Sequence, residues 1–205
     1  MNKREVVSYF NLNNTEVDKI EHFIKSIIDF NKHTNIIGKS TIENFWDRHI
    51  LDCLQLICFM KNKNSKIVDF GTGAGLPGVL FSIAGYQNVL MIESIKKKCD
   101  FVRKIIKELS LPAKIQNKRI ETTKTLNKDI IVSRALAPLS KLLTYALMHS
   151  HNNSTLLFLK GRNVNKEIEN AMKFFLFDII KIKSLSVGDG CVIKIKNLKT
   201  KKWLK

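Results

Sequence analysis

Residues 67–78 read Ile67-Val68-Asp69-Phe70-Gly71-Thr72-Gly73-Ala74-Gly75-Leu76-Pro77-Gly78, an apolar run with an acid followed by a loop with glycine at every second position. This pattern predicts a strand that turns sharply into a helix and leaves its backbone bare. Such a loop lets a ligand approach peptide N–H groups, and the helix N-terminus adds a positive partial charge. Glu93 ends the next apolar run, where a carboxylate can accept hydrogen bonds from ribose hydroxyls. We therefore predict a site for a nucleoside cofactor.

The identity of the cofactor depends on the acid before the glycines. Residues 73–78 also satisfy the dinucleotide pattern G-x-G-x-x-G, and a glycine-rich turn without a ligand is a further alternative. Asp69 argues against a dinucleotide, because its charge would repel a pyrophosphate. S-adenosylmethionine instead carries a sulfonium and an ammonium, which attract a carboxylate. The run acid-x-Gly-x-Gly-x-Gly, with a second acid ending the next strand, resembles the cofactor loop of class I methyltransferases.

Composition and charge limit the class of protein. The chain has 205 residues and 44% hydrophobic residues, which suits one soluble domain. Residues 1–14 are polar, without a signal peptide, and no apolar run could span a bilayer. We therefore expect a cytoplasmic protein with no membrane partner. The net charge of +17 favours a nucleic-acid partner, although AT-rich coding could explain part of the lysine excess.

The four cysteines do not suggest a metal site. They show no C-x-x-C pairing and no histidine at zinc spacing. Reduced residues of the core are the expectation for scattered cysteines in a cytosolic protein. We therefore predict no metal, and we expect a monomer.

The predicted elements form two parts. Residues 1–62 predict a helical extension, with one helix after Thr15 as N-cap, Asp18 three residues later, and a second helix over Ile42–Met60. From Ile67 onward strands and helices alternate, which predicts an α/β fold with helices on both faces of a parallel sheet. We assign 63–205 to one globular methyltransferase domain. Strands are expected at 66–70, 88–92, 113–116, 129–133, 154–159, 177–186 and 191–196, and helices near 77–84, 95–110, 138–149 and 164–173.

The C-terminal end predicts a hairpin. Val187-Gly188-Asp189-Gly190 leaves no room for a helix between the last two strands, so the last strand should be antiparallel. A Rossmann-like, seven-stranded and mostly parallel sheet with a terminal antiparallel hairpin fits the class I S-adenosylmethionine-dependent methyltransferase fold. The basic tail 199–205 is expected to add a phosphate contact.

Five strings together resemble one family. They are Arg48-His49-Ile50-Leu51-Asp52, the loop 71–78, Arg119-Ile120-Glu121, Ser133-Arg134-Ala135 and Leu159-Lys160-Gly161. In this order and spacing they are similar to the bacterial 16S ribosomal RNA methyltransferase G family, also called glucose-inhibited division protein B. The resemblance implies S-adenosyl-L-methionine as cofactor and 16S rRNA or the small ribosomal subunit particle as partner. It also implies methyl transfer to N7 of a guanine, at position 527 in the decoding-region loop.

The resemblance also implies roles for single residues. Cofactor contacts are implied at Gly71, Leu76, Ile120, Glu121 and Arg134, beside those that the loop pattern indicates at Asp69, Gly73, Gly75 and Glu93. The chain departs from the family pattern at four positions. Ala74 stands where proline is common in the family, and Leu136 stands where phenylalanine is common. Cys53 replaces a common serine, and Glu93 replaces a common aspartate. None of these departures removes a charge or a glycine.

The chemistry of guanine N7 needs alignment rather than a base, because N7 carries an in-plane lone pair and no proton. Arg134 and Lys160 end predicted strands at the edge where α/β sites lie, and we expect both to position the reacting groups. Alternatively, each caps a helix or pairs with an acid. Arg48 and Asp52 could form an i,i+4 ion pair, and His49 could be a buried, hydrogen-bonded histidine. The RNA-binding candidates are Arg48, His49, Arg119 and Lys160.

Two other function classes compete with this interpretation. A noncatalytic RNA-binding factor for ribosome assembly could use the same scaffold, but it would not need the intact acids and glycines of the loop. A small nucleotide-binding oxidoreductase would need a substrate domain, which is not evident, and would not need a net charge of +17.

Overall fold

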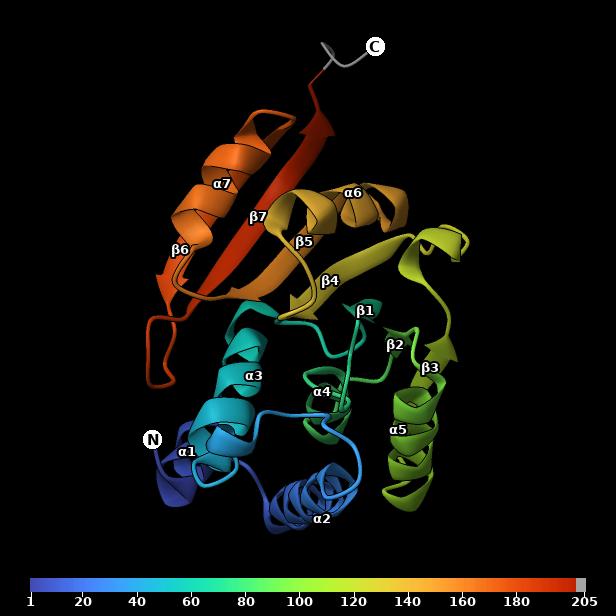
Figure 1. The fold of residues 1–205 in the computed structure, drawn as a ribbon, viewed down its shortest axis with the longest axis vertical. Helices are drawn as coiled ribbons and strands as arrows, with labels where there is room; N and C mark the ends of the chain where they lie inside the picture. The colour runs from blue at the N-terminus through green and yellow to red at the C-terminus, as the bar shows by residue number, and fades with distance from the viewer. Residues whose placement is uncertain (202–205) are drawn as a thin grey trace.

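The computed structural model describes residues 1–201 and is built on one seven-stranded sheet in the order β3-β2-β1-β4-β5-β7-β6 (Figure 1). Strands β1 to β5 pair in parallel, whereas β7 runs antiparallel to both β5 and β6. The predicted α/β sheet with a terminal antiparallel hairpin is therefore confirmed. The strands are β1 (Ile67–Phe70), β2 (Val89–Glu93), β3 (Ala113–Asn117), β4 (Lys128–Arg134), β5 (Ser150–Lys160), β6 (Phe175–Lys183) and β7 (Cys191–Thr200).

Helices cover both faces of the sheet. Helices α6 (Leu139–His149) and α7 (Val164–Met172) pack on one face, and they share a core with alternate residues of β1, β4 and β5. The opposite face packs against α4 (Gly78–Ile83), α5 (Lys96–Glu108) and the helices before β1. The four helices expected after β1 are thus confirmed within a few residues. Strands buried on both sides explain the continuous apolar runs in the sequence.

The N-terminal helices share this core. Phe23 and Ile27 of α2 (Asn14–Asn31) are buried in the same cluster as Val79 of α4 and Val102 of α5. A short helix, α1 (Lys3–Tyr9), precedes α2 and was not expected from the sequence. The extension therefore covers one face of the sheet beside the glycine-rich loop.

The predicted start of α2 is wrong by two residues. Asn13, not Thr15, is the N-cap: its side chain accepts from the backbone N–H of Glu16, and the Glu16 side chain accepts from that of Asn13. Asn13 and Glu16 satisfy two backbone donors reciprocally, whereas Thr15 lies within the first turn.

The segment 42–60 is not the single helix that periodicity suggested. It contains η2, a π-helical turn (Trp46–Leu51), followed by α3 (Asp52–Leu54) and the 3₁₀-helix η3 (Gln55–Phe59), after η1 (Lys39–Thr41). π-helical turns are rare in proteins overall, and those that occur often lie at functional sites. Here the irregular turns carry polar side chains that bond to residues far along the chain.

Three smaller points concern the cysteines, the start of β5 and the basic tail. Cys58 is exposed, unlike the core position that was expected, while Cys53, Cys99 and Cys191 are buried. β5 begins four residues earlier than predicted. In the basic tail, Lys199 and Thr200 belong to β7, and residues 202–205 lie outside the described part of the chain.

Candidate functional site

The glycine-rich loop connects β1 to α4 and lines a cavity of about 580 Å³. Gly71 and Gly73 have φ of +66° and +59°, a region that favours glycine. A β-carbon on Gly71 would lie 2.5 Å from Leu136 Cδ1, whereas one on Gly73 would meet only the Gly71 carbonyl oxygen at 4.0 Å. The backbone at Gly73 is therefore accessible to a ligand.

Glu93 stands at the end of β2 and is buried against this loop. Its Oε2 accepts from the Gly73 N–H at 3.0 Å, and its Oε1 accepts from the Ile95 N–H at 2.8 Å. Because a carboxylate has about four lone-pair sites, these two bonds leave capacity for hydroxyl donors. Glu93 lines the cavity and so occupies the predicted position.

Asp69 occupies a different position from the one expected. Side chains alternate along β1, which places the Asp69 carboxylate on the α4 side of the sheet, fully buried. Its Oδ2 accepts from Thr72 Oγ1 at 2.5 Å and from the Gly78 N–H at 2.9 Å, whereas its Oδ1 has no partner among the described residues. Burial raises the pKa of Asp69 to about 7. Asp69 does not line the cavity, so it supports the loop from beneath.

Gly75 also lies outside the cavity lining. A β-carbon there would lie 2.7 Å from Val79 and 3.4 Å from both Phe23 and Val102. Gly75 thus permits close packing of the loop on α2 and α5. The structure gives Gly75 a packing role, and its assignment as a cofactor contact stays a prediction.

The other predicted cofactor contacts meet at the first cavity. Its lining includes Gly71, Leu76, Ile120, Glu121 and Arg134 together with Arg119 and His49. Sequence reasoning missed Ile36, Ile37 and Gly38, which come from the connection after α2, and also Ser94, Lys118 and Tyr145. The connection carries a single glycine, Gly38, and no repeated glycine or acid pattern that could have shown its proximity to the loop.

A second cavity of about 710 Å³ lies beside the first. The two cavities share a wall made of Thr41, Arg134, Ala135 and Leu136. The second cavity is bounded by the end of β5, the start of α7 and the hairpin loop 184–190, and it includes Arg48 and Arg162. The carboxyl end of β4 thus lines both cavities and that of β5 lines the second, as expected for ligand sites in α/β sheets.

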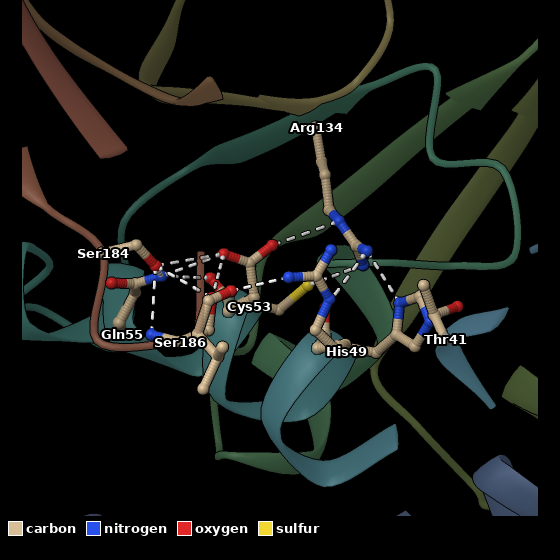
Figure 2. Close-up of polar contacts among 10 residues, drawn as sticks. Thr41, His49, Cys53, Gln55, Arg134, Ser184 and Ser186 are labelled. Carbon is tan, nitrogen blue, oxygen red and sulfur yellow. Dashed lines mark hydrogen bonds and ion pairs between the residues drawn. The ribbon is translucent and has the colours of Figure 1, made fainter. Parts of the chain in front are cut away.

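Arg134 is held in the shared wall by a polar network (Figure 2). Its Nε lies 3.3 Å from Asp52 Oδ2, and its Nη2 lies 2.7 Å from His49 Nδ1. Nη2 also contacts the Arg48 carbonyl oxygen, and Nη1 contacts Cys53 Sγ. Of the five guanidinium N–H groups, one remains without a partner among the described residues.

His49 is buried, which favours the second of its two interpretations. A guanidinium can only donate, so His49 Nδ1 accepts from Arg134 and Nε2 donates to Thr41 Oγ1 at 2.7 Å. Burial, and then the charges of Arg134 and Arg48, lower the pKa of His49 to about 3. His49 is therefore a neutral supporting residue, and its 3% exposure leaves little surface for RNA.

The same network reaches the hairpin loop. Gln55 Nε2 donates to Ser184 Oγ at 2.8 Å, and the Leu185 N–H donates to Gln55 Oε1 at 2.9 Å (Figure 2). Asp52 Oδ1 lies 3.4 Å from Ser184 Oγ and 3.3 Å from Ser186 Oγ. Desolvation raises the pKa of Asp52, while Arg134 and the two serines oppose the shift. Asp52 thus connects the loop to the shared wall.

Arg48 and Lys160 also have internal partners. Arg48 Nη1 donates to the Val187 carbonyl oxygen at 2.6 Å, and Asp52 pairs with Arg134, so the proposed Arg48–Asp52 pair is not formed. Lys160 Nζ lies 2.5 Å from Glu167 Oε2 and donates to the Ala137 carbonyl oxygen. This arrangement favours the ion-pair alternative for Lys160. Arg119 and Arg48 remain exposed at the cavity mouths.

Within residues 1–201, no group of three or more His, Cys, Asp or Glu side chains could hold a metal ion. No helix in that part of the chain is long and apolar enough to cross a bilayer.

Comparison with known proteins gives a consistent family. The family model described as GidB, rRNA small subunit methyltransferase G, matches residues 16–191. A ribosomal RNA small subunit methyltransferase G from Paramagnetospirillum magneticum is 30% identical over 198 residues, covering 97% of each chain. The protein of the same name from Rickettsia prowazekii is 38% identical over 182 residues, covering 89% of this chain and 94% of the relative.

Solved structures agree on the fold. A ribosomal protein L11 methylase from Lactobacillus delbrueckii subsp. bulgaricus superposes with a TM-score of 0.59 at 20% identity, covering 72% of this chain and 76% of the other. An MtNAS mutant in complex with S-adenosylmethionine gives a TM-score of 0.60 at 14% identity, covering 89% and 72%. At such identities the likeness establishes a shared fold.

Proposed function

Because the chain belongs to the rRNA small subunit methyltransferase G family, we propose that it transfers a methyl group from S-adenosyl-L-methionine to N7 of a guanine in 16S rRNA. The target implied by the family resemblance is the guanine of the decoding-region loop. The observation that carries the N7 assignment is the wall between the two cavities. Its four residues include a guanidinium but no histidine or carboxylate.

The first cavity fits the cofactor. The Gly73 backbone is open to a ligand, and the Glu93 carboxylate has lone pairs left for ribose hydroxyls. Ile120 and Glu121 follow β3 at the same edge, beside the cavity. When bound, S-adenosyl-L-methionine supplies an electrophilic methyl group on a sulfonium. The residues of this cavity bind and orient the cofactor.

The second cavity fits an unpaired nucleotide. A base must leave its stack before an enzyme can reach a ring atom, and this cavity opens beside the cofactor cavity at Ala135 and Leu136. Arg48 and Arg162 lie at its mouth, where they can contact phosphates. The remaining N–H of Arg134 can donate to the guanine carbonyl. Arg134 then positions the base while N7 keeps its lone pair free.

The reaction requires no proton acceptor. His49, the histidine nearest to Arg134, has both ring nitrogens engaged, and Asp52 is paired with Arg134. Proximity and orientation can supply on the order of 7–11 kcal/mol of the barrier reduction. A wall that holds the base in line with the methyl group and excludes water is therefore sufficient for this acceptor.

The test uses small subunits purified from a strain that lacks the enzyme. After incubation with the protein and labelled cofactor, nucleosides are identified by mass spectrometry and the modified position is mapped. We expect 7-methylguanosine at one site. Methyl groups on an exocyclic amine or a ribose would overturn the N7 assignment. Tight binding of the particles without any methyl incorporation would instead support a noncatalytic assembly factor.

A further inference from the structure

The outer part of the β6–β7 hairpin presents a face that no helix covers among residues 1–201. β6 is the last strand of the sheet, and α7 lies along one side of the hairpin (Figure 1). On that side, Phe175, Phe177 and Ile179 pack with the core of α6 and α7. The opposite side of the hairpin carries exposed side chains.

Cross-strand pairing fixes which residues share this opposite side. Leu176 pairs with Lys199, Asp178 with Lys196, and Ile180 with Lys194. Because paired residues of antiparallel strands point to the same face, these six residues form one surface, here called the lysine face. Leu176 is 54% exposed and Ile180 is 59% exposed.

The charges of the lysine face are not neutralised internally. No ion pair among residues 1–201 includes Lys194, Lys196 or Lys199. Asp178 accepts from Asn197 Nδ2 at 2.5 Å rather than pairing with a lysine. Lys194 lies over the Phe59 ring at 5.9 Å, so the face begins where the N-terminal extension ends. The surface thus combines three cations, one carboxylate and two exposed aliphatic side chains.

We propose that the lysine face binds a strand of ribosomal RNA outside the methylation site. Lysines two residues apart on a strand are separated by about 6.6 Å, which is similar to the spacing of consecutive phosphates. Leu176 and Ile180 lie opposite Lys199 and Lys194 on the neighbouring strand and can pack on ribose or base surfaces. A second copy of this chain is a poorer occupant, because its three lysines would face these three with like charge.

The position of the lysine face gives it a distinct role. At the other end of the hairpin, residues 186–190 line the second cavity. The lysine face begins at Lys194, four residue steps or about 13 Å from Gly190, and ends at Lys199, nine steps or about 30 Å from Gly190. RNA on the outer part of this face, at Lys196 and Lys199, is therefore remote from the nucleotide in the cavity. The contact would dock the substrate and would not take part in methyl transfer. This proposal rests on an rRNA substrate, as proposed above, and does not depend on which atom is methylated.

The test compares two charge-matched variants of the full chain. Lys196→Gln with Lys199→Gln removes two exposed cations of the lysine face. Lys25→Gln with Lys107→Gln removes two exposed cations of α2 and α5. Affinity for unmethylated small subunits is measured over a range of salt concentrations. Each lost phosphate contact should lower the magnitude of the slope of log affinity against log salt by about 0.7. The slope of the first variant should therefore be lower by about 1.4, and that of the second variant should equal the wild-type slope.

Further measurements separate docking from damage. The first variant should keep the wild-type affinity for S-adenosylmethionine and the wild-type single-turnover rate at saturating substrate. Ile180→Thr should weaken binding without changing the salt slope. Equal slopes in the two charge variants would overturn the proposal, as would a change of oligomeric state in the first. A product other than 7-methylguanosine would reject the N7 assignment and leave this proposal standing.

Discussion

Two acids with the same sequence context have different tasks at the level of single residues. Asp69 and Glu93 both lie at the ends of apolar strands, and the sequence suggested that both face the cofactor. The structure places Glu93 in the cavity and Asp69 beneath the loop, on the α4 side. The difference follows from strand alternation and from how the loop folds back. Neither can be read from spacing without knowing which sheet face carries α4.

Gly73 offers a direct test of the cofactor cavity. Valine at this position would place its side chain against the ligand, so Gly73→Val should abolish S-adenosylmethionine binding measured by calorimetry. Gly85→Val is the matched control: Gly85 has φ of +90° and open space around its β-carbon, and it lies outside the cavity lining. Both variants carry backbone strain of about 1–2 kcal/mol. Normal binding by Gly73→Val would reject the site.

Asp69 should make the stability of the ligand-free protein depend on pH. Its folded-state pKa of about 7 lies above the ordinary value of 3.8, so the folded protein binds more protons than the unfolded chain between these values. The free energy of unfolding should therefore fall as pH rises from about 4 to 7, by at most about 4 kcal/mol. Asp69→Asn should remove this part of the slope. If the free energy of unfolding, measured by denaturant titration, depended on pH identically in the wild type and in Asp69→Asn, the assignment would be contradicted.

The hairpin loop and the turns of residues 46–59 act together at the level of elements. Asp52, Gln55 and Arg48 come from turns that interrupt a regular helix, and all three contact the loop 184–190. These residues lie more than 120 positions apart in the sequence. From this network we propose that Asp52 is a positioning residue that acts through Arg134 and the loop.

Removing the Asp52 carboxylate should slow catalysis more than it weakens cofactor binding. Asp52→Ala leaves Arg134 without its counter-ion in a half-buried wall, so the guanidinium should lose its fixed orientation. We expect the single-turnover rate to fall about tenfold or more, with S-adenosylmethionine affinity nearly unchanged. The double variant Ser184→Ala with Ser186→Ala keeps the ion pair between Asp52 and Arg134, so its single-turnover rate should fall less. Equal losses in both variants would show that the loop, and not Arg134, carries the effect.

The sequence predicted the regular elements better than the connections. All seven strands and the helices after β1 follow from apolar periodicity and glycine punctuation. Residues 42–60 and the Ile36–Gly38 segment do not, because contacts with distant partners determine their conformation. The cofactor loop was predicted because its glycines lie close together in the sequence. The partners of Arg134 and Lys160 were not predicted, because they lie on distant segments.

The charge and the two cavities define the expected behaviour of the whole molecule. A net charge of +17 favours binding of a polyanion such as RNA, whereas we propose that the chemistry takes place at one wall. No residue of that wall is an acid or a histidine. Asp69, whose pKa is about 7, lies beneath the loop and can alter cofactor affinity with pH. Saturation with the cofactor should therefore separate this effect from the chemical step.

The chemical step itself should be insensitive to pH. Single-turnover methyl transfer at saturating RNA and cofactor should vary little from about pH 6 to 9, because an acceptor without a proton needs no base. The pKa of His49, lowered to about 3, keeps that imidazole neutral throughout this range. Arg134→Ala should lower the rate without introducing a pH dependence. A log-linear rise of the wild-type rate with pH would require removal of a proton, which would point to an exocyclic amine or a ribose hydroxyl and exclude guanine N7 as the acceptor.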